Sequence, residues 1–325
     1  MRIFICEYIT GGGIQDDELP QTLVHEGDLM LKALVSDLLD AGYEDLFCTR
    51  DIRLGDTVPG IESINPGKNI WETWKDCICN CDAVWIIAPE TDGILLDLTT
   101  MSEQIGCLLL GCSKSAVELA TSKKKTIDYL TGKKIPCVPV IEDLARLPDQ
   151  SSGWVIKPDD GIGAEDCYLF TERKLMNQYI SRKKTKRFIV QEYIRGIPAS
   201  ISMVCLNGHT IVLGCNQQLF TFNSGKGRLN GIVVNGIHRF TEQLTYLAKQ
   251  ICAAIKGLTG YVGVDLILTE NGPLVLEINP RLTTAYAGLS QSIKCNPAGI
   301  IISAIQNEHL PVLNDCKYDT VTINL

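Results

Sequence analysis

The sequence has little of what metal clusters and redox centres need. It contains only four histidines, and none of them stands at ligand spacing to the fourteen cysteines. No CxxC pair occurs, so a zinc or an iron–sulfur site is not predicted. Disulfide frameworks belong to small secreted chains, whereas this chain has 325 residues. We therefore expect reduced thiols in a cytoplasmic protein.

Other absences narrow the class of protein further. The first six residues predict a strand and are too short for the apolar core of a signal peptide, and no apolar run reaches membrane-spanning length. The net charge of −8 argues against a nucleic-acid surface, and the basic run Arg182–Arg187 is interpreted as a solvated helix end. Neither GxxxxGK[ST] nor GxGxxG occurs, and no set of residues suggests a side-chain nucleophile.

Strands and helices alternate over residues 1–113, which predicts an α/β domain with a small parallel sheet covered by helices on both faces. Ser113 is expected to cap the helix that follows. From about residue 114 onward the chain mixes helices with many strands, which predicts an α+β region. The strands expected in this second part are 154–157, 167–170, 188–192, 199–206, 210–215, 231–234, 261–268 and 274–278.

The most informative stretch lies between the last two of these strands. Asp265 stands in the first strand, and Glu277 and Asn279 share a face of the second because they are two residues apart. Carboxylate and amide oxygens suit Mg²⁺ or Mn²⁺, which keeps open positions for phosphate oxygens. Arg281, just beyond the strand, has the fork geometry that grips a phosphoryl group. The alternative is a polar strand end that faces solvent.

The turn of this hairpin sets which side chains meet. A two-residue loop at Asn271–Gly272 would place Asp265 opposite Ile278, on the wrong face for Glu277. A three-residue loop, Glu270–Gly272, would bring Asp265 opposite Glu277, with Gly272 at positive φ. The metal interpretation therefore predicts the longer loop.

Two weaker patterns suggest phosphate binding. Lys157 ends a strand and is followed by a loop with Gly161 and Gly163, where a cation and close backbone N–H groups suit a phosphate. An ordinary hairpin loop explains the same residues. Lys123 belongs to a basic run at the start of a helix, which is usually a solvated face. The strand 190–194 carries Gln and Glu, as an edge strand or a segment pairing with adenine would.

In this order, the pieces resemble the ATP-grasp family of carboxylate–amine ligases over essentially the whole chain. The resemblance implies a pre-ATP-grasp domain (1–113), a central ATP-grasp lobe (114–190) and a C-terminal lobe with the metal site (191–325). It implies ATP with Mg²⁺ or Mn²⁺ as cofactors, and Arg281 and Lys157 as catalytic residues. The implied ATP-binding residues are Lys123, Lys157, Gly161, Gly163, Gln191, Glu192, Tyr193 and Ile194, and the implied metal ligands are Asp265, Glu277 and Asn279.

One departure from the family concerns ribose. Many members carry an acidic residue that binds ribose shortly after the hinge, the segment beside adenine, which the resemblance places at Gln191–Ile194. Residues 196–202 contain no acidic residue here. Glu192 is expected to serve instead.

Within the family, the chain is most similar to the group that joins glutamate to tyramine in methanofuran biosynthesis. The residues that carry this resemblance are Glu7–Gly13, Ile87–Gly93, Ala199–Ser202 and Asn279–Thr284. They suggest substrate binding by Gly11, Gly12, Gly13, Glu90, Thr283 and Thr284. The glycines could equally form a flexible turn, and the threonines a plain strand.

The resemblance implies a small-molecule ligase. Glutamate and ATP would give an acyl phosphate, and tyramine would displace phosphate to form γ-glutamyltyramine. The alternatives are a ligase for another amino acid and amine, or an ATP-binding sensor without catalysis. No nucleic-acid or membrane partner is expected, whereas a homodimer is possible because many relatives form one.

Overall fold

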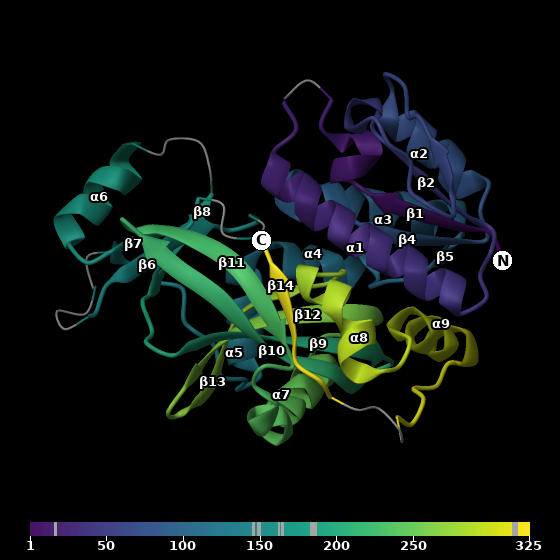
Figure 1. The fold of residues 1–325 in the computed structure, drawn as a ribbon. Coiled ribbons are helices and arrows are strands. Elements are labelled where there is room, and N and C mark those ends of the chain that lie inside the picture. Colours follow the sequence, from purple (N-terminus) through teal and green to yellow (C-terminus); the bar gives the residue numbers. More distant parts are fainter. Residues whose placement is uncertain are drawn as a thin grey trace.

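The computed structural model describes residues 1–15, 18–144, 147, 151–161, 163, 166–182, 187–313 and 318–325. Two β-sheets organise this part of the chain, one of five strands and one of nine. In Figure 1 the smaller sheet and its helices lie at the upper right, and the larger sheet curves through the lower left. The predicted order, an α/β domain followed by an α+β part, is confirmed.

The first sheet is parallel throughout and has the strand order β3-β2-β1-β4-β5. Its central position belongs to β1, the first strand of the chain, so the carboxyl ends of β1 and β4 lie side by side. Two strands, β2 and β3, were not predicted from the sequence. The strands are β1 (Ile3–Glu7), β2 (Leu46–Thr49), β3 (Glu62–Ile64), β4 (Ala83–Ile87) and β5 (Leu108–Leu109).

Helices cover both faces of this sheet, as predicted. Because side chains alternate along a strand, Ile3 and Ile5 pack against α1, whereas Phe4 and Cys6 pack against α2 and α3. Short helical turns follow two strand ends, η1 after β1 and η3 after β4. The elements of this layer are α1 (Gln21–Asp40), α2 (Ile70–Cys79), α3 (Ile94–Ile105), η1 (Ile9–Gly13), η2 (Ile52–Leu54) and η3 (Thr91–Gly93).

Two short helices connect the sheets. Ser113 caps α4 (Lys114–Thr121), as predicted, and Ser122 caps α5 (Lys123–Gly132), each by accepting a backbone N–H. Their apolar side chains share one core with the strands β12 and β13, so α4 and α5 pack on the large sheet. The cap at Ser122 places Lys123 at the first position of α5.

The large sheet is antiparallel and runs β13-β12-β9-β10-β11-β7-β6-β8, with β14 beside β11. The pair Lys226–Tyr168 joins β6–β8 to the rest. The predicted lobe boundaries at 113 and 190 stay predictions. The strands are β6 (Trp154–Pro158), β7 (Tyr168–Phe170), β8 (Phe188–Glu192), β9 (Ile197–Leu206), β10 (His209–Asn223), β11 (Lys226–Val234), β12 (Gly260–Thr269), β13 (Gly272–Asn279) and β14 (Val321–Asn324).

The remaining helices are α6 (Arg173–Arg182), α7 (Thr241–Ala254), α8 (Leu289–Ile293) and α9 (Pro297–Asn307), with η5 (His238–Phe240) and η6 (Thr284–Gly288). η6 and α9 carry the contact with α1. There the buried Tyr286 hydroxyl donates to Asp37 at 2.7 Å, and the Asn296 amide donates to the Asp37 carbonyl. Burial raises the pKa of Asp37 to about 6, against the opposing effect of the Tyr286 hydrogen bond.

The cysteines are mostly reduced, as predicted. Twelve of those in the described part of the chain are free thiols, most of them buried, whereas Cys295 is disulfide-bonded. The expectation of reduced thiols is therefore wrong at Cys295. Cys81 lies beyond the end of α2, in contact with Cys107, with 3.4 Å between the sulfur atoms.

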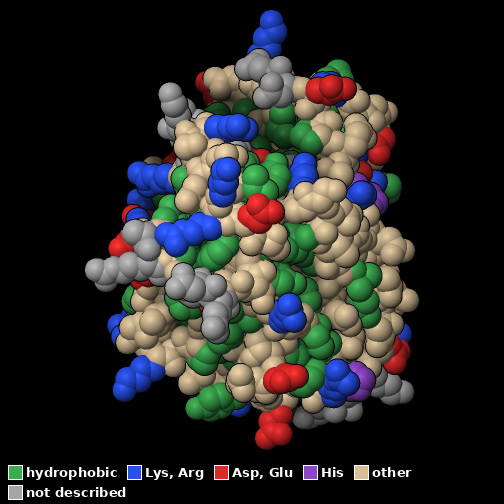
Figure 2. Space-filling view, turned by 90° about the vertical axis from the view of Figure 1, so that its left-hand side faces the viewer, with side chains coloured by type: hydrophobic (Ala, Val, Ile, Leu, Met, Phe, Trp, Pro, Cys, Tyr) green, Lys and Arg blue, Asp and Glu red, His purple; other side chains and the backbone are tan. Residues whose placement is uncertain are grey.

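No helix in the described part of the chain is both long enough and apolar enough to span a membrane. In the view of Figure 2, lysine and arginine side chains lie in separate places among apolar and uncharged atoms. The predicted helix end at Arg182 is present, but Lys183–Lys186 lie outside the described residues.

Candidate functional site: a nucleotide-sized cavity beside two carboxylates

The last hairpin places Asp265 opposite Glu277, as the metal interpretation requires. The predicted reason is wrong. Thr269 pairs with Gly272, so the loop contains only two residues, Glu270 and Asn271. The pairing of Asp265 with Glu277 arises further along, where one extra residue in β13 shifts the register. Gly272 has a positive φ of 116°, as predicted.

The extra residue is Leu276, and the bulge it forms turns two successive side chains to the same side. Leu276 and Glu277 both line the cavity described below, whereas their neighbours Val275 and Ile278 are buried in the core. A regular strand would send one of the two to the opposite face. The bulge therefore places an apolar contact and a carboxylate next to each other.

Asp265, Glu277 and Asn279 converge. The Asn279 amide nitrogen lies 3.3 Å from Asp265 Oδ2, and the Gln218 amide donates to Asp265 Oδ1 at 2.9 Å. Burial raises the pKa of Asp265, and the neighbouring Glu277 carboxylate raises it further. A divalent cation would stabilise two carboxylates that lie this close together, so the pair is suited to a metal ion.

The donor set agrees with such an ion. In the described residues no group of three or more His, Cys, Asp or Glu side chains forms a metal cage. Two carboxylates and an amide supply few oxygen ligands, which is the arrangement that Mg²⁺ or Mn²⁺ uses when phosphates complete its shell. The assignment of Asp265, Glu277 and Asn279 as ligands stays a prediction.

Two lysines, the buried Lys123 and the half-buried Lys157, face the same carboxylate. Lys157 Nζ lies 3.3 Å from Glu277 Oε2, and Lys123 Nζ lies 3.5 Å from the same atom. Burial alone would raise the pKa of Glu277, but the two ammonium groups outweigh it and hold that pKa well below its usual range. Lysines far apart in the sequence thus form one positive region beside the metal ligands.

The backbone after β6 holds Lys123 in place. The Lys123 ammonium donates to the Gly161 carbonyl at 2.6 Å, and the Asp159 carboxylate accepts from the Ser122 hydroxyl and the Lys124 N–H. From the other side, the Thr91 hydroxyl donates to the Asp160 carbonyl. These contacts could not be predicted from the sequence, because they join residues 69 and 37 positions apart.

The glycine loop is only partly described. Gly161 and Gly163 are placed, and Gly163 lines the large cavity, whereas Ile162 and Ala164 lie outside the described residues. The predicted role of this loop over the phosphates stays a prediction.

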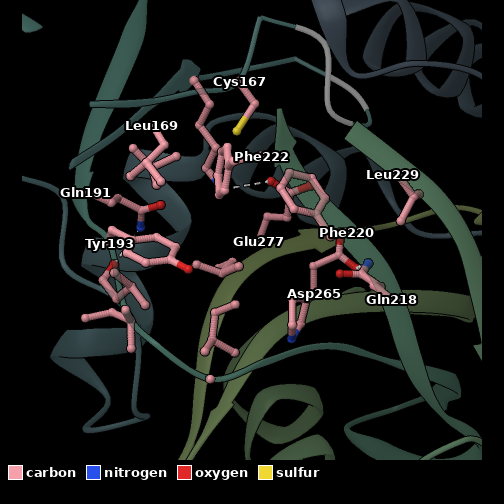
Figure 3. A pocket seen from close by; sticks show the side chains of 18 of the residues that line it. Cys167, Leu169, Gln191, Tyr193, Gln218, Phe220, Phe222, Leu229, Asp265 and Glu277 are labelled. Carbon is pink, nitrogen blue, oxygen red and sulfur yellow. Dashed lines mark hydrogen bonds and ion pairs between the residues drawn. The ribbon is translucent and has the colours of Figure 1, made fainter. Parts of the chain in front are cut away.

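A cavity of about 550 Å³ lies between β6–β8 and the hairpin β12–β13. Its size suits a nucleotide. Figure 3 shows Gln191, Tyr193 and Leu169 on one side, and Asp265, Glu277 and Gln218 toward the other. The predicted residues that line it are Lys157, Gly163, Gln191, Glu192, Tyr193, Ile194, Asp265 and Glu277.

The walls of this cavity explain which end could hold a base. Val138, Val155, Ile267 and Leu276 are apolar and lie with the hinge residues, and the charged groups gather around Glu277. The buried Gln191 side chain donates to the Val138 carbonyl at 2.7 Å and so is held by the protein itself. An apolar end and a charged end fit the base and the phosphates of one nucleotide.

Sequence reasoning missed several residues of this cavity. Gln218, Phe220 and Phe222 come from β10, and Phe222 meets Tyr193 edge to face, with ring centroids 5.9 Å apart. Leu229 comes from β11. Aromatic residues in a strand are expected in any core, so the sequence contained no signal that these rings face a ligand cavity.

Arg281 and Glu90 were predicted separately, and they contact each other. Arg281 Nε and Nη2 donate to the two carboxylate oxygens of Glu90 at 3.0 and 2.8 Å. This bidentate pair joins the end of β13 to the end of β4 and is nearly buried, with side chains 12% and 6% exposed. Roles for Arg281 at the phosphoryl group and for Glu90 at the substrate stay predictions.

A second cavity of about 110 Å³ continues from the metal ligands toward the parallel sheet. It shares Gly163, Gln218, Leu229, Asp265 and Glu277 with the larger cavity. Arg281, Thr283 and Thr284 line it, together with side chains from β1, α1 and the end of β4. Thr283 and Thr284 are therefore placed where a second substrate would meet the phosphates.

The glycine triplet after β1 is placed differently. Gly11, Gly12 and Gly13 are not among the residues that line either cavity. A Cβ atom would come within 2.7 Å of Thr49 at Gly11, within 2.7 Å of Pro66 at Gly12 and within 2.5 Å of the Tyr8 ring at Gly13. Close packing therefore explains all three glycines, and their predicted contact with a substrate anion stays a prediction.

Comparison with known proteins gives matches to families over most of the chain. The ATP-grasp domain family matches residues 120–285, which is more than half of the chain, and the pre ATP-grasp 3 domain family matches residues 45–117. The chain is 29% identical to a tyramine–L-glutamate ligase of Methanocaldococcus fervens, covering 98% of this chain and 99% of the relative. The corresponding ligase of Methanocaldococcus jannaschii is also 29% identical, over 95% and 90%.

Solved structures share the fold. An ATP-grasp superfamily protein from Archaeoglobus fulgidus superimposes with a TM-score of 0.72 at 22% identity, covering 100% of this chain and 99% of that one. An L-amino acid ligase from Bacillus licheniformis superimposes with a TM-score of 0.65 at 15% identity, covering 93% and 73%.

Proposed function

Because this chain belongs to the ATP-grasp domain family and is an ATP-dependent carbon–nitrogen ligase, we propose that it joins the γ-carboxyl group of L-glutamate to tyramine. The products are γ-glutamyltyramine, ADP and phosphate. The observation that carries the ligase chemistry is the meeting of Lys123, Lys157, Asp265 and Glu277 where two cavities join. The substrate pair comes from the two relatives.

In the first step the γ-carboxylate of glutamate attacks the γ-phosphorus of ATP. A new O–P bond forms, the bond to the β-phosphate oxygen breaks, and ADP leaves with the bonding electrons. Lys123 and Lys157 neutralise charge on the phosphates, and their fixed positions lower the barrier because no reorganisation is needed. Arg281, oriented by Glu90, faces the position of the transferring group.

Asp265, Glu277 and Asn279 would hold Mg²⁺ or Mn²⁺, which supplies charge neutralisation and orients the phosphate oxygens. Lys157 and Lys123 lie against Glu277. We infer that both ammonium groups turn toward the phosphates when ATP and the ion bind, since Glu277 then has another positive partner.

In the second step the amine nitrogen attacks the acyl carbon. The amine attacks in its neutral form: the C–N bond forms, the C–O bond to phosphate breaks, and the phosphate leaves with the bonding electrons and takes up the proton that the nitrogen loses. An acyl phosphate hydrolyses if water reaches it, so the site must be closed during this interval. Gly163 borders both cavities and is suitably placed for that closure.

The direct test is to incubate the purified protein with ATP, Mg²⁺, glutamate and tyramine and to follow ADP release and γ-glutamyltyramine by mass spectrometry. We expect product only when all four are present. If another amino acid or amine gave product with a higher kcat/KM, the ligase activity would stand and the proposed substrates would be wrong. Tight ATP binding without any turnover over a broad panel of amino acids and amines would favour the sensor alternative. The cytoplasmic location and the possible homodimer stay predictions from the sequence.

A further inference from the structure

The second cavity has a one-sided charge. Its lining includes the carboxylates of Glu7, Glu26, Asp265 and Glu277, whereas Arg281 is the single cation among its described lining residues. Glu90 already pairs with that cation. On the side toward α1 the cavity is lined by the carboxyl groups of Glu7 and Glu26, and burial raises the pKa of Glu7. Next to Glu26 a cationic ligand group is favoured and a carboxylate is opposed.

Glu7 and Glu26 differ in how they are held. Glu7 is buried, and its carboxylate accepts from the Ile9 N–H, the Thr10 N–H and the Thr10 hydroxyl, so it serves mainly to hold the turn after β1. Glu26 is less buried and accepts from the Thr284 hydroxyl at 2.7 Å. That hydrogen bond connects α1 to the segment that follows β13.

The backbone of α1 is shaped to bring Glu26 to this place. A Cβ atom at Gly27 would lie 2.8 Å from Glu7 Oε1, so glycine lets α1 approach the end of β1 closely. Glu26 stands one residue earlier and lines the cavity from the same side. Helix α1 therefore contributes a charged group at a fixed distance from the acyl-transfer position.

The rest of the wall toward α1 and β11 is apolar. It consists of Ile9, Leu23, Met30, Ile87, Leu229 and Ile232. Together with Glu26, these side chains form a cavity that is complementary to a primary amine with a hydrophobic body: an ammonium group for the carboxylate and an apolar part for the wall.

We propose that Glu26 binds the ammonium group of the acceptor substrate and that this cavity selects amines that carry no carboxylate. The proposal rests on the ligase function proposed above and deepens it by assigning the acceptor its place. Glu26 is a specificity-determining residue: its carboxylate binds the nitrogen as an ammonium group and takes one proton from it, so that the nitrogen can attack as a neutral amine. The metal ligands and lysines act on the phosphates. The proposal implies that tyramine is accepted and tyrosine, which differs by one carboxylate, is rejected.

The test separates the two half-reactions. Hydroxylamine, a small uncharged nucleophile, can displace phosphate from glutamyl phosphate to give the hydroxamate without using the amine cavity. We expect Glu26→Gln to form hydroxamate from ATP, Mg²⁺ and glutamate at the wild-type rate. Its kcat/KM for tyramine should fall about 10- to 100-fold, as expected for a lost hydrogen bond to a charged group. The Thr284 hydroxyl can still donate to glutamine, so the fold is preserved.

Glu44→Gln is the matched control, because it removes the same charge from an exposed position of the same domain. It should leave both reactions unchanged. Glu26→Lys should in addition raise the use of tyrosine relative to tyramine, since the repelling charge becomes attractive. Wild-type protein should prefer tyramine over tyrosine by about 100-fold or more, the scale of a buried charge mismatch.

Three results would overturn the proposal. Unchanged kcat/KM for tyramine in Glu26→Gln, with normal hydroxamate formation, would remove Glu26 from the amine site and leave the ligase intact. A rise in the KM for glutamate in place of tyramine would assign Glu26 to the amino acid. Wild-type protein that forms neither hydroxamate nor amide would remove the proposed function and this inference with it.

Discussion

The two sheets present their polar side chains in different ways. In the parallel sheet, Glu7 ends β1 and Glu90 follows β4, so both lie at the carboxyl edge where the strands stop. In the antiparallel sheet, Gln218, Asp265 and Glu277 lie on the face, in the middle of long strands. At the edge, Glu90 joins the two domains through its pair with Arg281. We propose that the edge also contributes substrate contacts, whereas the face contributes the groups that act on phosphates.

This difference predicts whether a substitution should lower activity or stability. A side chain on the face projects from a strand that is paired in the sheet. Removing it should therefore leave the fold intact and lower the rate of the reaction. A group at the edge is held by ion pairs and hydrogen bonds to the other domain, so its removal costs stability together with substrate binding. The following substitutions test this division.

The largest effect is expected on the face. Lys157→Ala and Asn279→Ala should each lower kcat by about a thousandfold, because phosphoryl transfer here depends on fixed charges. ADP release measures the loss, and circular dichroism should show an intact fold. Lys125→Ala, which removes an exposed lysine of the same basic run as Lys123, should retain full activity. Near-normal turnover in either variant would contradict the assignment of the face to catalysis.

A smaller effect, and of another kind, is expected at the edge. Glu90→Gln leaves the nearly buried Arg281 without its anionic partner, so the free energy of unfolding should fall by about 3 kcal/mol. Urea denaturation measures this, with the exposed Glu44→Gln as the reference. If Glu90→Gln kept full stability and lost only turnover, the edge would behave like the face and the comparison would fail.

The contact between the domains should depend on pH. The pKa of Asp37 is raised to about 6 in the folded protein, against about 3.9 in an unfolded chain. The folded state therefore binds more protons between these values, and its stability falls as pH rises from 4 to 7, by an amount on the order of 2–3 kcal/mol. Asp37→Asn should remove this part of the pH dependence while keeping an acceptor for the Tyr286 hydroxyl.

Melting temperatures from pH 4 to 7 would measure it. Glu44→Gln, at an exposed position shortly after the same helix, is the control and should keep the wild-type slope. An unchanged slope in Asp37→Asn would show that the carboxyl does not take up a proton in this range.

The smallest effect is expected at the hairpin tip. Gly272 has a positive φ, so Gly272→Ala should cost about 1 kcal/mol. Turnover should be unchanged, because the bulge at Leu276 lies between the tip and Glu277. Thermal melting and ADP release check the two parts. A loss of turnover beyond about tenfold would mean that the tip, and not the bulge, determines where Glu277 points.

The hairpin also shows how far sequence reasoning reached. The residue types correctly indicated that Asp265 and Glu277 meet and that Gly272 has a positive φ, but the predicted cause of the pairing, a three-residue loop, was wrong. The loop length was wrong, since a β-bulge has no signature in Leu276 itself. If side chains are assumed to alternate strictly along both strands, no bulge is allowed, and the length of the turn alone determines which residues pair.

Contacts over long sequence distances were beyond reach for a general reason. Arg281 and Glu90 were each selected as polar residues after a strand, but nothing in either motif indicates that the two side chains meet. The same holds for Asp160 and Thr91, and for Glu26 and Thr284. Strands β2 and β3 were missed because they are only four and three residues long, too short to show a period.

The shared wall between the two cavities has a consequence for inhibitor chemistry. Gln218, Leu229, Asp265 and Glu277 border both spaces, so no layer of protein separates a bound nucleotide from a bound amine. A single molecule that carries an adenosine phosphate at one end and an aromatic amine at the other can therefore fill both. Linking the two parts turns the second binding event into an intramolecular one and raises affinity without new contacts. Its selectivity over other nucleotide-binding enzymes would come from the amine end, where α1 supplies the charge.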